Sequence, residues 1–210
     1  MVAINRLISE EHRILVARRL CEKISLHGIC RTIGVSSRWL MDFMVAGFAA
    51  VPEHVQVQPV AYSGAVLLGC LEGEADELCS FVQKKTNPRW VWRAMVKQTR
   101  QILAFHIGDR RRDSAKQLWA KIPARSRDRA TCYTDQHAAY IGVIPSAPHQ
   151  AVTQHARHTN SIERFNNTLG QRVSRLVRNT LAFSTKVENH IGALRYFICH
   201  YTLTRAALPV

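Results

Sequence analysis

The sequence predicts an α/β protein in which a mixed β-sheet with flanking helices follows a small all-α domain. Two changes of pattern along the chain support this. Residues 1 to about 46 have the apolar spacing of short helices, and from about residue 71 the pattern changes to strands followed by helices. The stretch between them is rich in small residues and contains prolines, which is typical of a linker. We therefore expect a helical domain over 1–46, a linker over 47–70 and a larger domain over 71–205.

The helical part contains the pattern of a helix-turn-helix. After a first helix over 9–23, Ile29 and Ile33 lie four residues apart on one face of a second helix. Gly34 supplies a turn residue that tolerates positive φ. Ser36 or Ser37 then caps a third helix. A plain αα-hairpin has the same pattern, but the turn chemistry in so basic a chain favours DNA binding.

The second helix of a helix-turn-helix presents its first residues to the major groove. In this sequence the residues at that place are Ser37 and Arg38, with Asp42 one turn later. We expect Ser37 and Arg38 to contact DNA.

The larger part contains strands and helices in a defined order. The patterns predict, in order, strands over 77–84, 90–96 and 102–107, a helix over 112–122, a strand over 130–134, an extended piece near 150–154, and helices over 161–178 and 184–202. Three antiparallel strands, a helix, and then strand and helix again form the order of a ribonuclease H-like sheet. In such a sheet the first and fourth strands are neighbours.

Charge and cysteine usage restrict the class of partner. The chain has 29 Lys and Arg against 15 Asp and Glu, a net charge of +14, which favours a polyanionic partner such as nucleic acid. Charge alone does not exclude a structural basic protein. No apolar run approaches the roughly 20 residues that span a bilayer, so we expect no membrane segment. Six widely separated cysteines without a C-x-x-C pair argue against a zinc ribbon or a secreted disulfide framework, and we expect a cytoplasmic, nucleoid-associated protein.

Three acids occupy positions that allow them to converge. Asp76 is expected at the start of the first strand, Asp135 directly follows the fourth, and Glu163 lies in the first turn of the next helix. An acid at a strand end is usually only solvated, and a Glu in a first helical turn suits the helix dipole. Together, however, three carboxylates supply the hard oxygen ligands that hold two divalent ions for phosphodiester chemistry. We expect Asp76, Asp135 and Glu163 to be catalytic residues and metal ligands.

Several motifs resemble those of insertion sequence one family transposases. They are Asp76-Glu77-Leu78-x-Ser80-Phe81-Val82, Arg89-Trp90-Val91-Trp92, Tyr133-Thr134-Asp135-x-x-x-x-Tyr140, Ile162-Glu163-Arg164-Phe165-Asn166-x-Thr168-Leu169 and Arg175-Leu176-Val177-Arg178-x-Thr180-Leu181. With the helix-turn-helix, the resemblance extends over most of the chain, from about Ile8 to Tyr201.

The resemblance implies a DDE-type enzyme that uses two Mg²⁺ or Mn²⁺ ions to cut DNA at element ends and to join the ends to target DNA. It implies the terminal repeats and target DNA as partners and a homo-oligomer on DNA. It also implies DNA contacts by Arg164, Asn166, Arg175 and Arg178.

The sequence departs from the family pattern at positions that bear on activity. Cys79 stands where the family usually has tryptophan, and Gly170 stands where it usually has Lys or Arg, seven residues after the catalytic Glu. Gly170 shares the face of Glu163, where a cation would meet a DNA phosphate. The alternative to an active transposase is therefore a weakened or inactive remnant that only binds DNA.

Overall fold

The computed structural model describes residues 8–52, 55, 71–82, 86–128, 130–145, 149–151, 159–173, 176 and 186–206. The elements in chain order are α1 (Glu10–Arg19), α2 (Leu26–Ile33), α3 (Ser37–Ala50), β1 (Leu71–Phe81), β2 (Pro88–Val96), β3 (Ile102–Gly108), α4 (Arg112–Lys121), α5 (Ala124–Arg127), β4 (Ala130–Thr134), the 3₁₀ turn η1 (Ala138–Tyr140), β5 (His149–Ala151), α6 (Asn160–Arg172) and α7 (Val187–Ala206).

The N-terminal helices form the predicted helix-turn-helix arrangement. Gly34 ends α2 in the left-handed conformation, at φ 77°, which a residue without Cβ adopts readily. The Ser36 side chain accepts a hydrogen bond from the Trp39 backbone N–H, so Ser36 and not Ser37 caps α3. Val35 and Leu40 are buried in a small core between the three helices.

The sheet has five strands in the order β3-β2-β1-β4-β5. The first three strands pair antiparallel, whereas β4 pairs parallel with β1 and β5 pairs parallel with β4. This confirms the expected ribonuclease H-like mixed sheet, with the first and fourth strands as neighbours.

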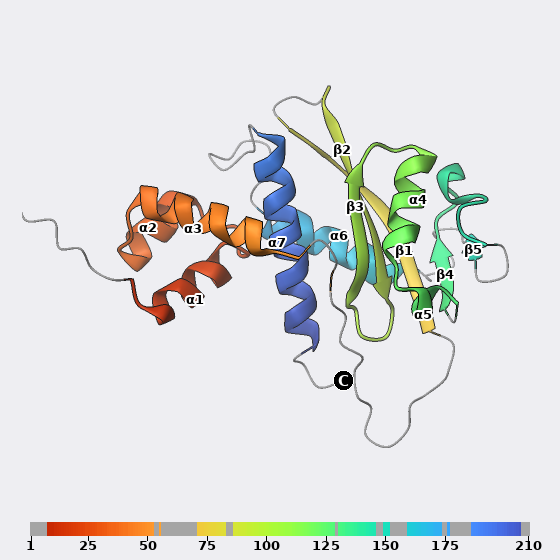
Figure 1. The fold of residues 1–210 in the computed structure, drawn as a ribbon, viewed down its shortest axis with the longest axis horizontal. Helices are drawn as coiled ribbons and strands as arrows, with labels where there is room; N and C mark the ends of the chain where they lie inside the picture. Colours follow the sequence, from red (N-terminus) through yellow and green to blue (C-terminus); the bar gives the residue numbers. More distant parts are fainter. Residues whose placement is uncertain are drawn as a thin grey trace, which may run out of the picture.

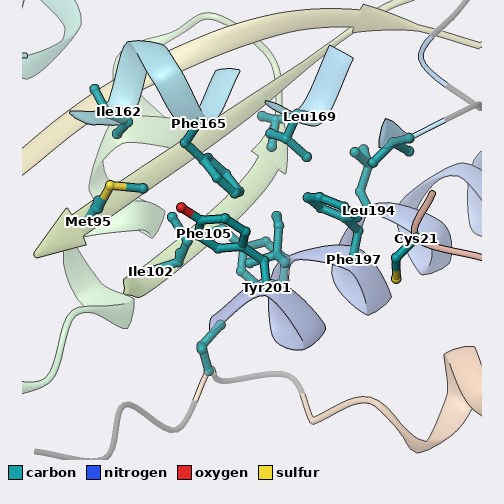
Figure 2. Close-up of a cluster of buried hydrophobic side chains, with 14 residues drawn as sticks. Cys21, Met95, Ile102, Phe105, Ile162, Phe165, Leu169, Leu194, Phe197 and Tyr201 are labelled. Atoms are coloured by element: carbon teal, nitrogen blue, oxygen red, sulfur yellow. The ribbon is translucent and has the colours of Figure 1, made fainter. Parts of the chain in front are cut away.

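Helices cover both faces of the sheet (Figure 1). α6 and α7 contact one face, and α4 with η1 contacts the other. Two apolar cores result, one on each face. Figure 2 shows the core under α6 and α7, where the rings of Phe165, Phe197 and Tyr201 meet above Met95 and Ile102 of the strands.

The N-terminal helices pack against α7 on the side away from the sheet (Figure 1). Cys21, which follows α1, is fully buried in the same core as the residues of α6 and α7 (Figure 2). Within the described residues, no helix combines the length and apolar character that a membrane span requires.

Several predicted boundaries are wrong. β1 begins at Leu71 and not at 77, because the polar and glycine-containing segment 72–76 is held in the sheet by pairing with β2 and β4. α1 ends at Arg19, before Lys23, which has a positive φ. α6 ends at Arg172 and not near 178, because Val173 takes an extended conformation and is buried in the core. The third helix runs to Ala50, past the expected end of the helical part at residue 46.

Candidate functional site

Two acids meet where β1 and β4 separate. The last pair in the β1–β4 ladder is Ala75 with Thr134, so Asp76 is the next residue of β1 and Asp135 is the residue that follows β4. Because the two strands run parallel, these positions lie at the same edge of the sheet. Asp76 is not at the start of its strand as expected, but is the sixth of the 11 residues of β1.

A third carboxylate belongs to the same cluster. Ligand oxygens of Asp76, Glu77 and Asp135 lie within 4.8 Å of one another. Sequence reasoning did not select Glu77, because neighbours on a strand point to opposite faces of the sheet. The sequence signal for Glu77 is its position directly after Asp76. The β1–β4 ladder ends before these two residues, so they are no longer paired with β4.

On the α6 face of the sheet, Asp76 is held by a buried arginine and an amide. The amide of Asn166 donates a 2.6 Å hydrogen bond to Asp76 Oδ2, and Arg93 Nη2 lies 3.8 Å from the same oxygen. Arg93 also donates to Asn166 and lies over the Phe165 ring, 5.9 Å from its centroid. Burial lowers the pKa of Arg93 to about 10, so it remains a cation at neutral pH. Its signal in the sequence is a lone charge within the apolar run of β2.

On the other face, Glu77 is buried with three polar neighbours. Its Oε1 accepts hydrogen bonds of 3.2 and 3.1 Å from Nε and Nη2 of Arg110, and its Oε2 accepts one of 3.2 Å from the Tyr140 hydroxyl. His137 Nε2 lies 3.8 Å from Oε1. Burial raises the pKa of Glu77, and Asp135 raises it further, whereas His137 and Arg110 lower it. Burial also raises the pKa of Tyr140 well above its ordinary value, so the phenol stays protonated and donates to Glu77.

Glu163 stands apart from this cluster. It is exposed in the first turn of α6, and its Oε1 accepts a 3.0 Å hydrogen bond from the Thr159 hydroxyl. Among the described residues, the cluster of oxygens within 4.8 Å does not include Glu163. However, Asn166 is three residues later on the same helix face, and it contacts Asp76 directly. Glu163 therefore lies about one helical turn from Asn166, whose amide is hydrogen-bonded to Asp76.

A buried carboxylate fixes the start of α6 at this place. Glu74 has no exposed surface, and its Oε2 accepts a 2.7 Å hydrogen bond from the backbone N–H of Ile162. The first N–H groups of a helix have no partner within the helix, so a carboxylate there satisfies one of them and suits the dipole. Glu74 and Asp76 lie on the same face of β1 and contact α6 one turn apart.

The residues expected to contact DNA have different surroundings. Ser37 and Arg38 are exposed in the first turn of α3, and Arg164 is exposed on α6. Asn166 is partly buried and its amide is engaged with Asp76. The other two, Arg175 and Arg178, lie outside the described residues.

Comparison with known proteins links this site to a family. A sequence-family model described as IS1 transposase matches residues 68–203. The chain is 33% identical over 125 residues to insertion element iso-IS1n protein InsB of Shigella dysenteriae, covering 60% of this chain and 92% of that protein. It is 28% identical over 154 residues to insertion element IS1 4 protein InsB of Escherichia coli (strain K12), covering 71% and 86%.

Among solved structures, the fold is similar to the simian T-cell lymphotropic virus intasome in complex with PP2A regulatory subunit B56 gamma. The TM-score is 0.45 at 12% sequence identity, with 87% of this chain and 66% of that chain covered. The residues matched by the family model include the five-stranded sheet, α6 and the acids described above. The chain belongs to the IS1 transposase family.

Proposed function

We propose that the chain is an active DDE transposase that cuts DNA at the ends of its insertion sequence and joins them to target DNA. Asp76, Asp135 and Glu163 are its catalytic residues and hold two Mg²⁺ or Mn²⁺ ions. One observation carries the proposal: in a chain of this family, Asp76 and Asp135 converge where β1 and β4 separate.

The donor set fits a hard divalent cation. Asp76 and Asp135, whose ligand oxygens lie within 4.8 Å of each other, repel one another, and a bound cation offsets this repulsion. Oxygen ligands of this kind suit Mg²⁺ and Mn²⁺ rather than zinc, which favours His and Cys. Glu163 is exposed and hydrogen-bonded to its own helical turn, so no packed core holds its carboxylate away from the other two acids.

The side chains of the site have separate tasks. Bound metal ions would supply activation of a water or a 3′-hydroxyl and stabilisation of the leaving oxygen. Arg93 and Asn166 hold Asp76 in one orientation. The backbone N–H of His137 donates a 3.1 Å hydrogen bond to Asp135 Oδ1, which orients the second carboxylate.

DNA binding is proposed for the basic surface. The net charge of +14 attracts phosphate, and the exposed Ser37 and Arg38 begin a helix suited to the major groove. Arg164 is the neighbour of Glu163 and is exposed, so it is suited to a phosphate beside the acids. Arg175 and Arg178 are proposed to bind DNA on the resemblance of their motif. Because the reaction joins two ends, we propose at least a dimer on DNA.

The experiment is a strand-transfer assay with the full chain and oligonucleotides that carry the terminal repeats. We expect joined products with Mg²⁺ or Mn²⁺, none after chelation, and recovery when the metal is restored. Specific binding to the repeats without cleavage under any metal condition would instead support the DNA-binding remnant. The observation that favours this remnant is Gly170, which leaves the Glu163 face of α6 without a cation at that position.

A further inference from the structure

Glu77 lies close to the two acids but belongs to the opposite face of β1 from α6. Both of its oxygens already accept hydrogen bonds, Oε1 from Arg110 and Oε2 from Tyr140. Its side chain is 2% exposed, against 20% for Asp76. A carboxylate that is occupied and shielded in this way is less suited to bind an ion directly than to hold its neighbours.

Glu77 contacts the segment 135–140, which begins with Asp135. Asp135 Oδ1 accepts from the His137 backbone N–H, and His137 Nδ1 in turn accepts a 3.0 Å hydrogen bond from the Ala139 backbone N–H. The other ring nitrogen, Nε2, lies 3.8 Å from Glu77 Oε1. Tyr140 ends the same turn with its hydroxyl on Oε2.

The segment 135–140 thus contacts Glu77 through the Tyr140 hydrogen bond and through the close approach of His137 Nε2 at 3.8 Å. The ring of Trp92 packs edge-on against His137 and Tyr140, with centroid distances of 6.0 and 5.4 Å, and fills the space beneath them. Arg110 supplies the countercharge from a side chain that is 49% exposed and lies over the Trp90 ring.

We propose that Glu77 is a positioning residue that holds the segment 135–140 against β1, through Tyr140 and His137, so that Asp135 stays beside Asp76. This inference rests on the proposed function, because it concerns the geometry of the metal ligands. Without such an attachment, repulsion between the two aspartates would separate them before an ion binds.

The test is the Mn²⁺ affinity of the full chain, measured by electron paramagnetic resonance, for Glu77→Gln, Tyr140→Phe and the double variant. Tyr140→Phe removes the hydroxyl contact and leaves every carboxylate in place. Removing partners that orient metal ligands typically weakens metal binding by about 10- to 100-fold. We expect losses in this range from both single variants. Because Tyr140 acts on the site through Glu77, the double variant should be no weaker than Glu77→Gln alone.

Two outcomes overturn the inference. A loss with Glu77→Gln alone, with Tyr140→Phe equal to the parent, makes Glu77 a direct ligand. Unchanged affinity in both leaves Glu77 without a role at the site. Asp76→Asn serves as the reference: if it leaves Mn²⁺ affinity unchanged, the metal site itself is wrong and the proposed function fails separately.

Folding is checked by near-ultraviolet circular dichroism. If the buried substitutions unfold the chain, Arg110→Gln gives the same test from a partly exposed side chain. This variant removes the countercharge and both hydrogen bonds to Oε1, and the inference predicts weaker Mn²⁺ binding. An unchanged affinity in a folded Arg110→Gln variant would overturn it.

Discussion

Glu74 is a carboxylate that joins the middle of the sheet to the first turn of α6. Its side chain is fully buried, and its pKa is raised above its ordinary value of 4.5, chiefly by burial, although hydrogen bonds from Ile162 and Ser161 lower it. The folded state therefore favours the protonated acid. Its stabilising effect is present at low pH and is lost as the pH rises through the raised pKa.

This predicts the behaviour of Glu74→Gln, which keeps an oxygen acceptor for the Ile162 N–H and removes the buried charge. The free energy of unfolding of the variant, minus that of the parent, should increase from about pH 4 to about pH 7. Urea unfolding at several pH values measures this difference. A difference that does not change with pH would show that the ionisation of Glu74 is not coupled to folding.

Gly170 tests whether the missing cation limits activity. A Cβ built at this position meets nothing within 4 Å, so the first atom of a side chain has room here. We predict that Gly170→Arg raises the rate of strand transfer more than it raises DNA affinity, because an arginine on the Glu163 face would align a phosphate near the acids.

Gly170→Ala is the control, since replacing a glycine within a helix stabilises it by up to about 1 kcal/mol whatever the charge. Equal activity of the alanine and arginine variants would mean that charge at position 170 does not matter. Melting temperatures measured beside the rates separate stability from catalysis.

At the scale of elements, α3 begins with two adjacent serines in different environments. The Ser36 side chain caps the helix, whereas that of Ser37 is exposed in its first turn, with the Cys30 sulfur 3.8 Å away. We predict that Ser36→Ala lowers the stability of the chain by about 1 kcal/mol. Ser37→Ala should leave stability unchanged and weaken binding to the terminal repeats. Thermal unfolding and a gel-shift titration distinguish the two, and the reverse assignment of effects would contradict the account.

Elements with strong local signals were predictable from the sequence. The helix-turn-helix follows from Gly34 and a serine cap, and β4 follows from a short apolar run before Asp135. The start of β1 was missed because Glu72, Gly73 and Glu74 do not favour strands, and their conformation depends on pairing with β2 and β4. The end of α6 was misplaced because the burial of Val173, a tertiary effect, ends the helix.

The residues of the candidate site also differ in how strongly the local sequence indicates them. Asp76 and Asp135 could be predicted to converge from the sequence. Each lies in or directly after a strand, and the order of the elements predicts that these two strands are neighbours. Glu77 and Arg93 have weaker signals, a place beside Asp76 and a charge within an apolar run. Their roles depend on partners distant in sequence, such as Tyr140 and Asn166. Local patterns carry no information about such contacts.

At the scale of the molecule, the N-terminal helices and the sheet domain share an interface along α7. Phe48 of α3 packs edge-on against Tyr196, with ring centroids 5.7 Å apart. Arg172 of α6 donates a 3.2 Å hydrogen bond to the carbonyl of Cys21 and forms an ion pair with Glu22. The position of the helix-turn-helix relative to the acids is thus held by packing.

Gly192 on α7 allows the close approach of α3. A Cβ at this position would lie 2.8 Å from Cδ2 and 3.0 Å from Cβ and Cγ of Phe48, so Gly192→Ala requires Phe48 or one of the two helices to shift. Overpacking of this kind typically costs about 1–3 kcal/mol. We predict that Gly192→Ala lowers the free energy of unfolding, whereas the matched change Gly170→Ala raises it. Equal effects of the two substitutions would show that α3 does not depend on this contact.

The central claim is that Asp76, Asp135 and Glu163 act together in catalysis. The most direct measurement is the strand-transfer rate of Asp76→Asn, Asp135→Asn and Glu163→Gln in Mg²⁺. The chain offers matched controls: Asp113→Asn, with a side chain 86% exposed on α4, and Glu188→Gln, exposed in the first turn of α7 as Glu163 is in that of α6. We predict that each of the three variants loses joining activity while still binding the terminal repeats, and that both controls remain active. Joining by Asp76→Asn or Asp135→Asn at the parent rate would contradict the account, and a fully active Glu163→Gln would remove Glu163 from the site.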